Sequence, residues 1–207
     1  MRKNPTSILA IICILALLAA IYATMMPQYI SKNDEALADF STERALNQVE
    51  IIAQKPHYVG STNHELVANY LKLELNRIGL ETSVQEGFTL NDKGLLVKSK
   101  NILARIKGTD SSKKALLLLS HYDSAPHSYS LGASDDASGV ATILESVRAF
   151  LYAKKQHKND IIILFTDAEE LGLNGAALFV TQHQWAKNVG LVLNFEARGS
   201  SGPSYML

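Results

Sequence analysis

The chain is 207 residues long, a length suited to one domain with a short appendage. Its 20 basic residues balance its 20 acidic residues and no run of like charge stands out, so we expect no nucleic-acid partner. The single cysteine, Cys13, excludes an internal disulfide.

The N-terminal segment predicts a membrane anchor. A short basic start, residues 1–7 with Arg2 and Lys3, precedes an almost unbroken apolar run at residues 8–26. As a helix this run reaches roughly 28 Å, close to the hydrocarbon thickness of a bilayer. Residues 19–23 are a poor cleavage site, so we favour a retained single-pass anchor over a cleaved signal peptide or a buried core helix. The basic start then stays in the cytoplasm, and the rest of the chain lies on the extracytoplasmic side, in the periplasm, the extracellular space or an organelle lumen.

The remaining sequence predicts an α/β fold. After a linker at residues 27–39, Ser41 caps a helix that Pro56 ends, and Thr62 or Asn63 caps a second helix that ends at Gly79. Further along the chain, apolar strands alternate with helices, which indicates a mostly parallel mixed sheet flanked by helices on both faces. The expected strands are residues 80–88, 101–107, 115–119, 161–165 and 191–193, and the expected later helices are residues 137–155 and 173–184.

Acidic residues and one histidine stand where the predicted strands end, or at the start of the helix that follows. They are His121 and Asp123, Asp135 and Asp136, Glu169 and Glu170, and Glu196. Ligand sites of open α/β sheets lie beyond the carboxyl ends of the strands. So many carboxylates would repel one another without a cation, so the pattern predicts a metallohydrolase site.

Each group also has a simpler structural explanation. A lone histidine at a strand end is often structural, but Asp123 can accept a hydrogen bond from its far ring nitrogen and orient the near one toward a metal. An aspartate at a helix start is a common N-cap, but two in succession exceed what a cap needs, and one carboxylate can bridge two cations. Adjacent glutamates can form a solvated loop, or one can bind the metal while the other takes a proton from water.

Four ordered motifs resemble peptidase family 28 of the metallopeptidases, the co-catalytic di-zinc aminopeptidases. They are HYDS at residues 121–124, GASDDASG at 132–139, DAEELG at 167–172 and NFEARGSSGP at 194–203. The resemblance extends from about residue 40 to the end. It is strongest to the membrane-anchored branch found in vacuolar and endoplasmic reticulum membranes, and it implies a zinc-exopeptidase-like fold of the phosphorylase/hydrolase type.

The resemblance implies a role for each motif residue. His121 and Glu196 bind one zinc, Glu170 binds the second, and Asp135 bridges both ions. Asp136 follows Asp135 through a cis peptide, Asp123 supports His121, and Glu169 is the general base that activates water. The implied function is a zinc-dependent aminopeptidase acting on peptide substrates, with two zinc ions in the complete protein.

One feature departs from the family pattern. No histidine follows His183, although the family places a final histidine on the second zinc. The chain also ends in a strand-like segment at residues 202–207. We therefore expect residues 40–207 to be the N-terminal portion of a metallopeptidase domain in a C-terminally truncated fragment, whose activity alone is doubtful. Two alternatives are a glutaminyl-cyclase-like acyltransferase with one zinc, and an inactive receptor-like or chaperone-like relative.

Overall fold

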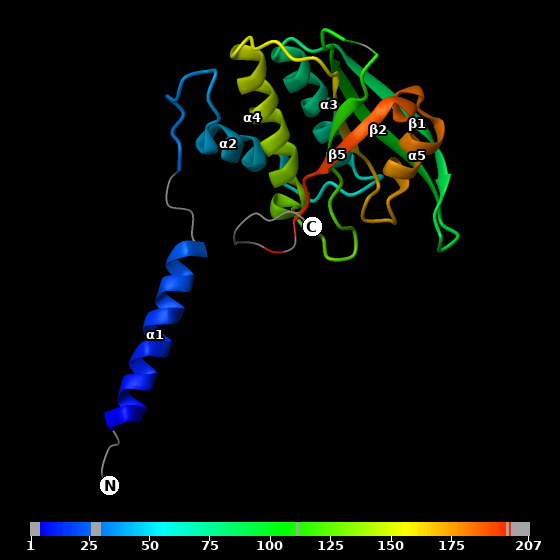
Figure 1. Cartoon of the computed structure of the whole chain (residues 1–207). Coiled ribbons are helices and arrows are strands. Elements are labelled where there is room, and N and C mark those ends of the chain that lie inside the picture. The colour runs from blue at the N-terminus through cyan, green and yellow to red at the C-terminus, as the bar shows by residue number, and fades with distance from the viewer. Residues whose placement is uncertain (1–4, 26–29, 111, 198, 200–207) are drawn as a thin grey trace. The chain divides into compact units, whose positions relative to one another are not determined.

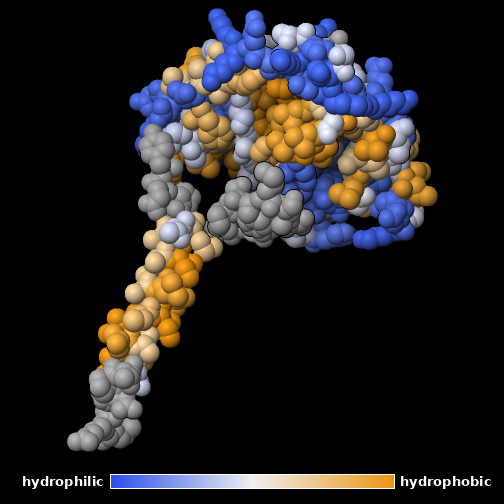
Figure 2. All heavy atoms as spheres, viewed as in Figure 1, coloured by the Kyte–Doolittle hydropathy of each residue, from blue (hydrophilic) through white to orange (hydrophobic). Residues whose placement is uncertain are grey.

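The computed structural model describes residues 5–25, 30–110, 112–197 and 199, in two units that are treated separately. The first unit contains helix α1, Pro5–Met25. Residues Ser7–Met25 have a mean hydropathy of 2.7 and bury none of their surface, so this helix is long and apolar enough to cross a membrane. Figure 2 shows apolar side chains along its length. The strand-like segment expected at residues 202–207 lies outside the described residues.

The second unit, residues 31–198, begins with two capped helices. Helix α2 is Thr42–Ile52, and the side chain of Ser41 caps it by accepting a hydrogen bond from the Arg44 N–H, as predicted. Helix α3 is Thr62–Arg77. Its cap is Ser61, which accepts from the His64 N–H, so the expectation of Thr62 or Asn63 was wrong by one or two residues. Residues 61–63 are all good capping types, and only the backbone path decides among them.

A five-stranded mixed sheet forms the centre of this unit (Figure 1). Its strands are β1 Thr82–Leu90, β2 Leu96–Ile106, β3 Ala115–His121, β4 Ile161–Thr166 and β5 Val189–Asn194. They lie in the order β1-β2-β4-β3-β5. Strand β2 is antiparallel to both of its neighbours, whereas β3 is parallel to β4 and β5, so β2 alone runs against the other strands.

Helices cover both faces of the sheet, which confirms the predicted α/β class. Helices α2, α3 and α4 (Ser138–Tyr152) form one core with the sheet, around Leu71, Ile143 and Phe165. Helix α5 (Asn174–Gln182) and a short 3-10 helix at Gln184–Asn188 cover the other face, around Leu164 and Phe179.

Strand β2 is longer than its sequence pattern predicted. It begins at Leu96 because the β1–β2 hairpin continues in register to the pair Leu90↔Leu96. Strand β4 pairs only with the second half of β2, from Ile102 to Ile106. The first half of β2 therefore has a strand on one side only.

Candidate metal centre

The parallel strands bring three of the predicted motifs to one edge of the sheet. His121 is the last residue of β3 and pairs with Thr166, the last residue of β4. Strand β5 runs beside β3, and the Phe195 N–H continues that ladder by donating to the Leu119 carbonyl at 2.8 Å. The segments that carry Glu169, Glu170 and Glu196 therefore leave the sheet beside His121.

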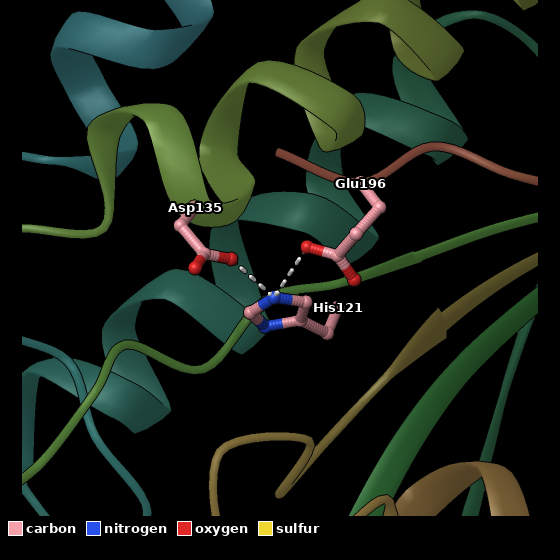
Figure 3. Close-up of side chains that lie close together, drawn as sticks. All are labelled: His121, Asp135 and Glu196. Carbon is pink, nitrogen blue, oxygen red and sulfur yellow. Dashed lines mark hydrogen bonds and ion pairs between the residues drawn. The ribbon is translucent and has the colours of Figure 1, made fainter. Parts of the chain in front are cut away.

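His121, Asp135 and Glu196 form a compact cluster (Figure 3). The Nε2 atom of His121 lies 2.9 Å from Asp135 Oδ1 and 3.8 Å from Glu196 Oε1. One ligand atom from each residue lies within 4.8 Å of the others. The histidine side chain is 2% exposed and that of Asp135 is 51% exposed, so the cluster is buried at His121 and open to solvent at Asp135.

Asp123 holds the His121 ring at Nδ1, the nitrogen that faces away from the cluster. We expected its carboxylate to be the hydrogen-bond acceptor, but the main-chain carbonyl is closer. Nδ1 lies 3.0 Å from the main-chain carbonyl oxygen of Asp123 and 3.4 Å from its carboxylate Oδ1. The closer partner of the ring is thus the carbonyl. A ring that donates from Nδ1 presents Nε2 toward Asp135 and Glu196, the orientation that a metal ligand needs.

The carboxylate of Asp123 connects two of the predicted motifs. It is buried, and it accepts hydrogen bonds from the Glu169 N–H at 3.0 Å and the Glu170 N–H at 3.3 Å. Asp123 therefore contacts the imidazole on one side and holds the backbone of both glutamates on the other.

The two successive aspartates have separate surroundings. Asp136 is buried: its Oδ1 accepts from the Gly139 N–H in the first turn of α4 at 3.1 Å, and its Oδ2 accepts from Ser120 Oγ at 2.5 Å. Asp135 faces the cluster. The peptide between them is cis, as the resemblance implied. A Cβ at position 139 would lie 2.6 Å from the Asp136 carboxylate oxygens, so any larger residue there would displace that carboxylate.

The glutamates after β4 lie in an acidic environment. Burial and the neighbouring carboxylates of Glu196, Asp123 and Asp135 together raise the pKa of Glu169, against the effect of His121. Burial and the charges of Asp135, Glu169 and Asp123 also raise the pKa of Glu170. The charge of Asp135 acts on Glu170, but Glu170 does not belong to the group of described residues whose ligand atoms lie within 4.8 Å of one another.

The electrostatic environment of the cluster favours a bound cation. Burial disfavours a charged imidazole, but the carboxylates of Asp123 and Glu196 and the charge of Asp136 outweigh it and raise the pKa of His121 to about 12. In the described part of the chain, no lysine or arginine pairs with Asp135, Glu169, Glu170 or Glu196. One imidazole and several carboxylates that favour positive charge form a donor set suited to zinc.

Two buried histidines beside the site were not predicted to belong to it. The His57 N–H donates to Ser124 Oγ at 2.9 Å, and burial lowers the pKa of its ring. His64 Nε2 donates to Asp167 Oδ1 at 2.7 Å, just before the two glutamates. His127, in the loop between the first two motifs, is exposed.

A sequence model described as Peptidase family M28 matches residues 101–207, which include all four motifs. The chain belongs to peptidase family M28. Among curated M28 relatives, it is 32% identical over 215 residues to the vacuolar membrane protease of Candida dubliniensis, covering 99% of this chain and 23% of that protein. The chain thus spans about a quarter of the length of this relative.

Solved structures share the fold. A leucine aminopeptidase precursor and a glutaminyl cyclase bound to N-acetylhistamine, both from Bacteroides thetaiotaomicron, each match with a TM-score of 0.63 and 25% identity. Both matches cover 77% of this chain; they cover 63% of the aminopeptidase precursor and 62% of the cyclase. A Zn-dependent exopeptidase from Parabacteroides distasonis matches with a TM-score of 0.55 and 28% identity, covering 65% and 49% of the two chains.

Proposed function

We propose that the protein carrying this chain is a zinc-dependent exopeptidase of family M28, most specifically an aminopeptidase. The observation that carries the proposal is the convergence of His121, Asp135 and Glu196 on one open-sided point, next to the loop that presents Glu169 and Glu170. The names of an aminopeptidase precursor and a Zn-dependent exopeptidase among the structural neighbours support it.

The position of each residue indicates whether it would bind metal, transfer a proton or hold its neighbours in place. His121, Asp135 and Glu196 would hold one zinc, and Glu170 and Asp135 would hold another. Zinc bound there supplies a Lewis acid that polarises the scissile carbonyl and lowers the pKa of water. Glu169 accepts the proton of the attacking water and passes it to the leaving amine, a task suited to a carboxylate with a raised pKa. Asp123 holds the ring and both glutamates in place.

A glutaminyl cyclase is the second candidate, because a solved cyclase matches as well as the aminopeptidase precursor. The two reactions can be distinguished with one substrate, a peptide that begins with glutamine. A peptidase releases free glutamine, whereas a cyclase releases ammonia and leaves a pyroglutamyl peptide.

The experiment uses the full-length protein, purified in detergent, with zinc counted by mass spectrometry. We expect free glutamine from the test peptide and loss of turnover in Glu169→Gln with unchanged zinc content. Pyroglutamyl product would favour the cyclase, and a metal-free protein without turnover would contradict both enzymatic proposals.

We further propose that α1 is an uncleaved anchor and that the catalytic unit lies on the extracytoplasmic side. The exposed apolar surface of α1 and the basic residues before it support this orientation. In sealed vesicles from a vacuolar or secretory membrane, added protease should leave the unit intact until detergent is added. Digestion without detergent, or a mature N-terminus near Ala23, would contradict the proposal.

A further inference from the structure

The first half of strand β2 has a free edge at the carboxyl side of the sheet. Strand β1 pairs with one edge of β2 from Leu96 to Ala104. On the other edge, β4 pairs only from Ile102 onward. No strand of the described chain lies beside residues 96–100 on that side.

The main-chain groups that face this edge can be identified from Lys100. Its N–H donates to Asp167 Oδ2 and its carbonyl accepts from the Tyr122 hydroxyl, both at 2.8 Å, so the Lys100 main chain faces away from β1. Alternate residues of a strand point their main-chain groups to the same edge. Lys98 and Leu96 therefore face it too, and neither makes a hydrogen bond there with any described residue.

A groove of about 690 Å³ runs along this edge. Its walls are residues 95–100 of β2, residues 59–61 before α3, and Asp167 and Leu171 of the loop after β4. Its rim carries both charges, with Lys98 Nζ 2.9 Å from Glu86 Oε2. In the wall, the buried hydroxyl of Ser99 has no hydrogen-bond partner in the described chain.

The groove lies next to the proposed base. Glu169 is two residues from Asp167 and two from Leu171, and both of these line the groove. Consecutive Cα atoms are about 3.8 Å apart, so the Cα of Glu169 is at most about 7.6 Å from the Cα of either residue. A peptide held at Glu169 needs only a few extended residues to reach the edge of β2.

We propose that this groove binds an extended peptide as an added strand, with main-chain hydrogen bonds to the N–H and carbonyl of Lys98. Unpaired main-chain groups along a strand edge recognise extended peptides whatever their side chains. The inference rests on the proposed function and deepens it, because the added strand is the part of the substrate beyond the scissile bond. The preferred substrates are then peptides of several residues, and dipeptides leave the groove empty.

The test compares two proline substitutions in the full-length protein. Lys98→Pro removes the N–H that faces the groove, and the β1–β2 ladder keeps its hydrogen bonds. Val84→Pro is the matched control. Its neighbours Ser83 and Gln85 pair with Leu103 and Asn101, whose main chains face β1. The main chain of Val84, which lies between them, therefore faces the outer edge of β1, away from β2.

Binding is measured on the Glu169→Gln background with a labelled peptide of about eight residues, roughly 27 Å when extended. Loss of one hydrogen bond should raise its Kd at least about fivefold in Lys98→Pro and leave it within about twofold in Val84→Pro. Lys98→Ala, which keeps the N–H, should also stay within about twofold. Equal affinity in Lys98→Pro and Val84→Pro would overturn the proposal.

Hydrogen exchange needs no substitution in the groove and keeps the proposal testable if Lys98→Pro does not fold. Saturating peptide should slow amide exchange in residues 95–100, and unchanged exchange there would overturn the proposal. Binding is scored without turnover, so a protein that binds the peptide but hydrolyses nothing would contradict the proposed function and leave this inference standing.

Discussion

His64 Nε2 lies 2.7 Å from Asp167 Oδ1, and both side chains are buried, although 103 residues separate them in the chain. The ring of His64 also stacks on the ring of Tyr122, with 5.1 Å between the ring centroids. The other oxygen of Asp167 accepts from the Lys100 N–H. This pair anchors the start of the loop that carries Glu169 and Glu170.

The first prediction follows from that pair. His64→Ala leaves a buried carboxylate without its side-chain donor, so the free energy of unfolding should fall by about 1–3 kcal/mol, with a loss of turnover. His64→Gln keeps a donor and should recover part of both. Thermal unfolding and kcat measure the effect. His127→Ala, at an exposed position, is the control and should change neither quantity.

The second prediction separates the two glutamates. Glu169→Gln should lower kcat by at least about a hundredfold, because it removes the proton acceptor. Its zinc content should stay unchanged. Glu170→Gln should lower zinc content together with turnover. The opposite pattern in the two variants would mean that the base and the ligand are exchanged.

The third prediction concerns the adjacent aspartates. Asp135→Asn should lower zinc occupancy at both proposed positions, because one bridging carboxylate screens two cations from each other. Asp136→Ala removes the acceptor of the Gly139 N–H in the first turn of α4 and should lower the free energy of unfolding by about 1 kcal/mol. Zinc counting and thermal unfolding of both variants check this division. Full zinc content in Asp135→Asn would exclude it as the bridge.

The fourth prediction is a pH dependence of stability outside the site. Glu145 is buried and accepts from Arg44, Arg148 and the Ser41 N–H. Burial tends to raise its pKa, but these donors outweigh burial and lower it. The stabilisation that ionised Glu145 adds to the folded state is therefore fully present above its pKa in the unfolded chain, about 4.3. It is lost as the pH falls through the lower pKa that Glu145 has in the folded protein.

Glu145→Gln should thus lower the free energy of unfolding by about 2–4 kcal/mol at pH 7, where two partly buried arginines lose their partner. The difference from the unsubstituted protein should shrink as the pH falls below about 4. Unfolding curves over this pH range give the measurement. Glu74→Gln, which loses a pair with the exposed Arg77, should cost less than about 1 kcal/mol at any pH. A constant difference between pH 7 and acid would contradict the argument.

The sequence was informative where a short pattern determines the structure. Apolar runs predicted β3, β4 and β5 and the class of the fold, and the cap of α2 at Ser41 follows from one residue type before a helix. The pair Asp135 and Asp136 suggested both a cap and a ligand; in the structure Asp136 accepts from the first turn of α4, and Asp135 faces His121.

Features that depend on distant contacts could not be predicted. The choice of Ser61 as a cap depends on the path of the backbone into α3. The early start of β2 depends on pairing with β1, since Lys98 and Lys100 do not have the apolar character of a core strand. The contact of His64 with Asp167 forms only when α3 packs beside the end of β4, and no local pattern indicates it.

The position of Asp123 has a consequence for how the site takes up metal. One buried residue faces the His121 ring through its carbonyl and holds the Glu169 and Glu170 amides through its carboxylate. Protein hydrogen bonds thus set the spacing between the imidazole and both glutamates, independently of any ion. Zinc binding there would meet an imidazole and a glutamate loop that are already positioned, so we expect these two parts of the site to lose little conformational entropy on loading. We expect the rate of loading to be governed by removal of water from the ion, with no slow rearrangement of the chain.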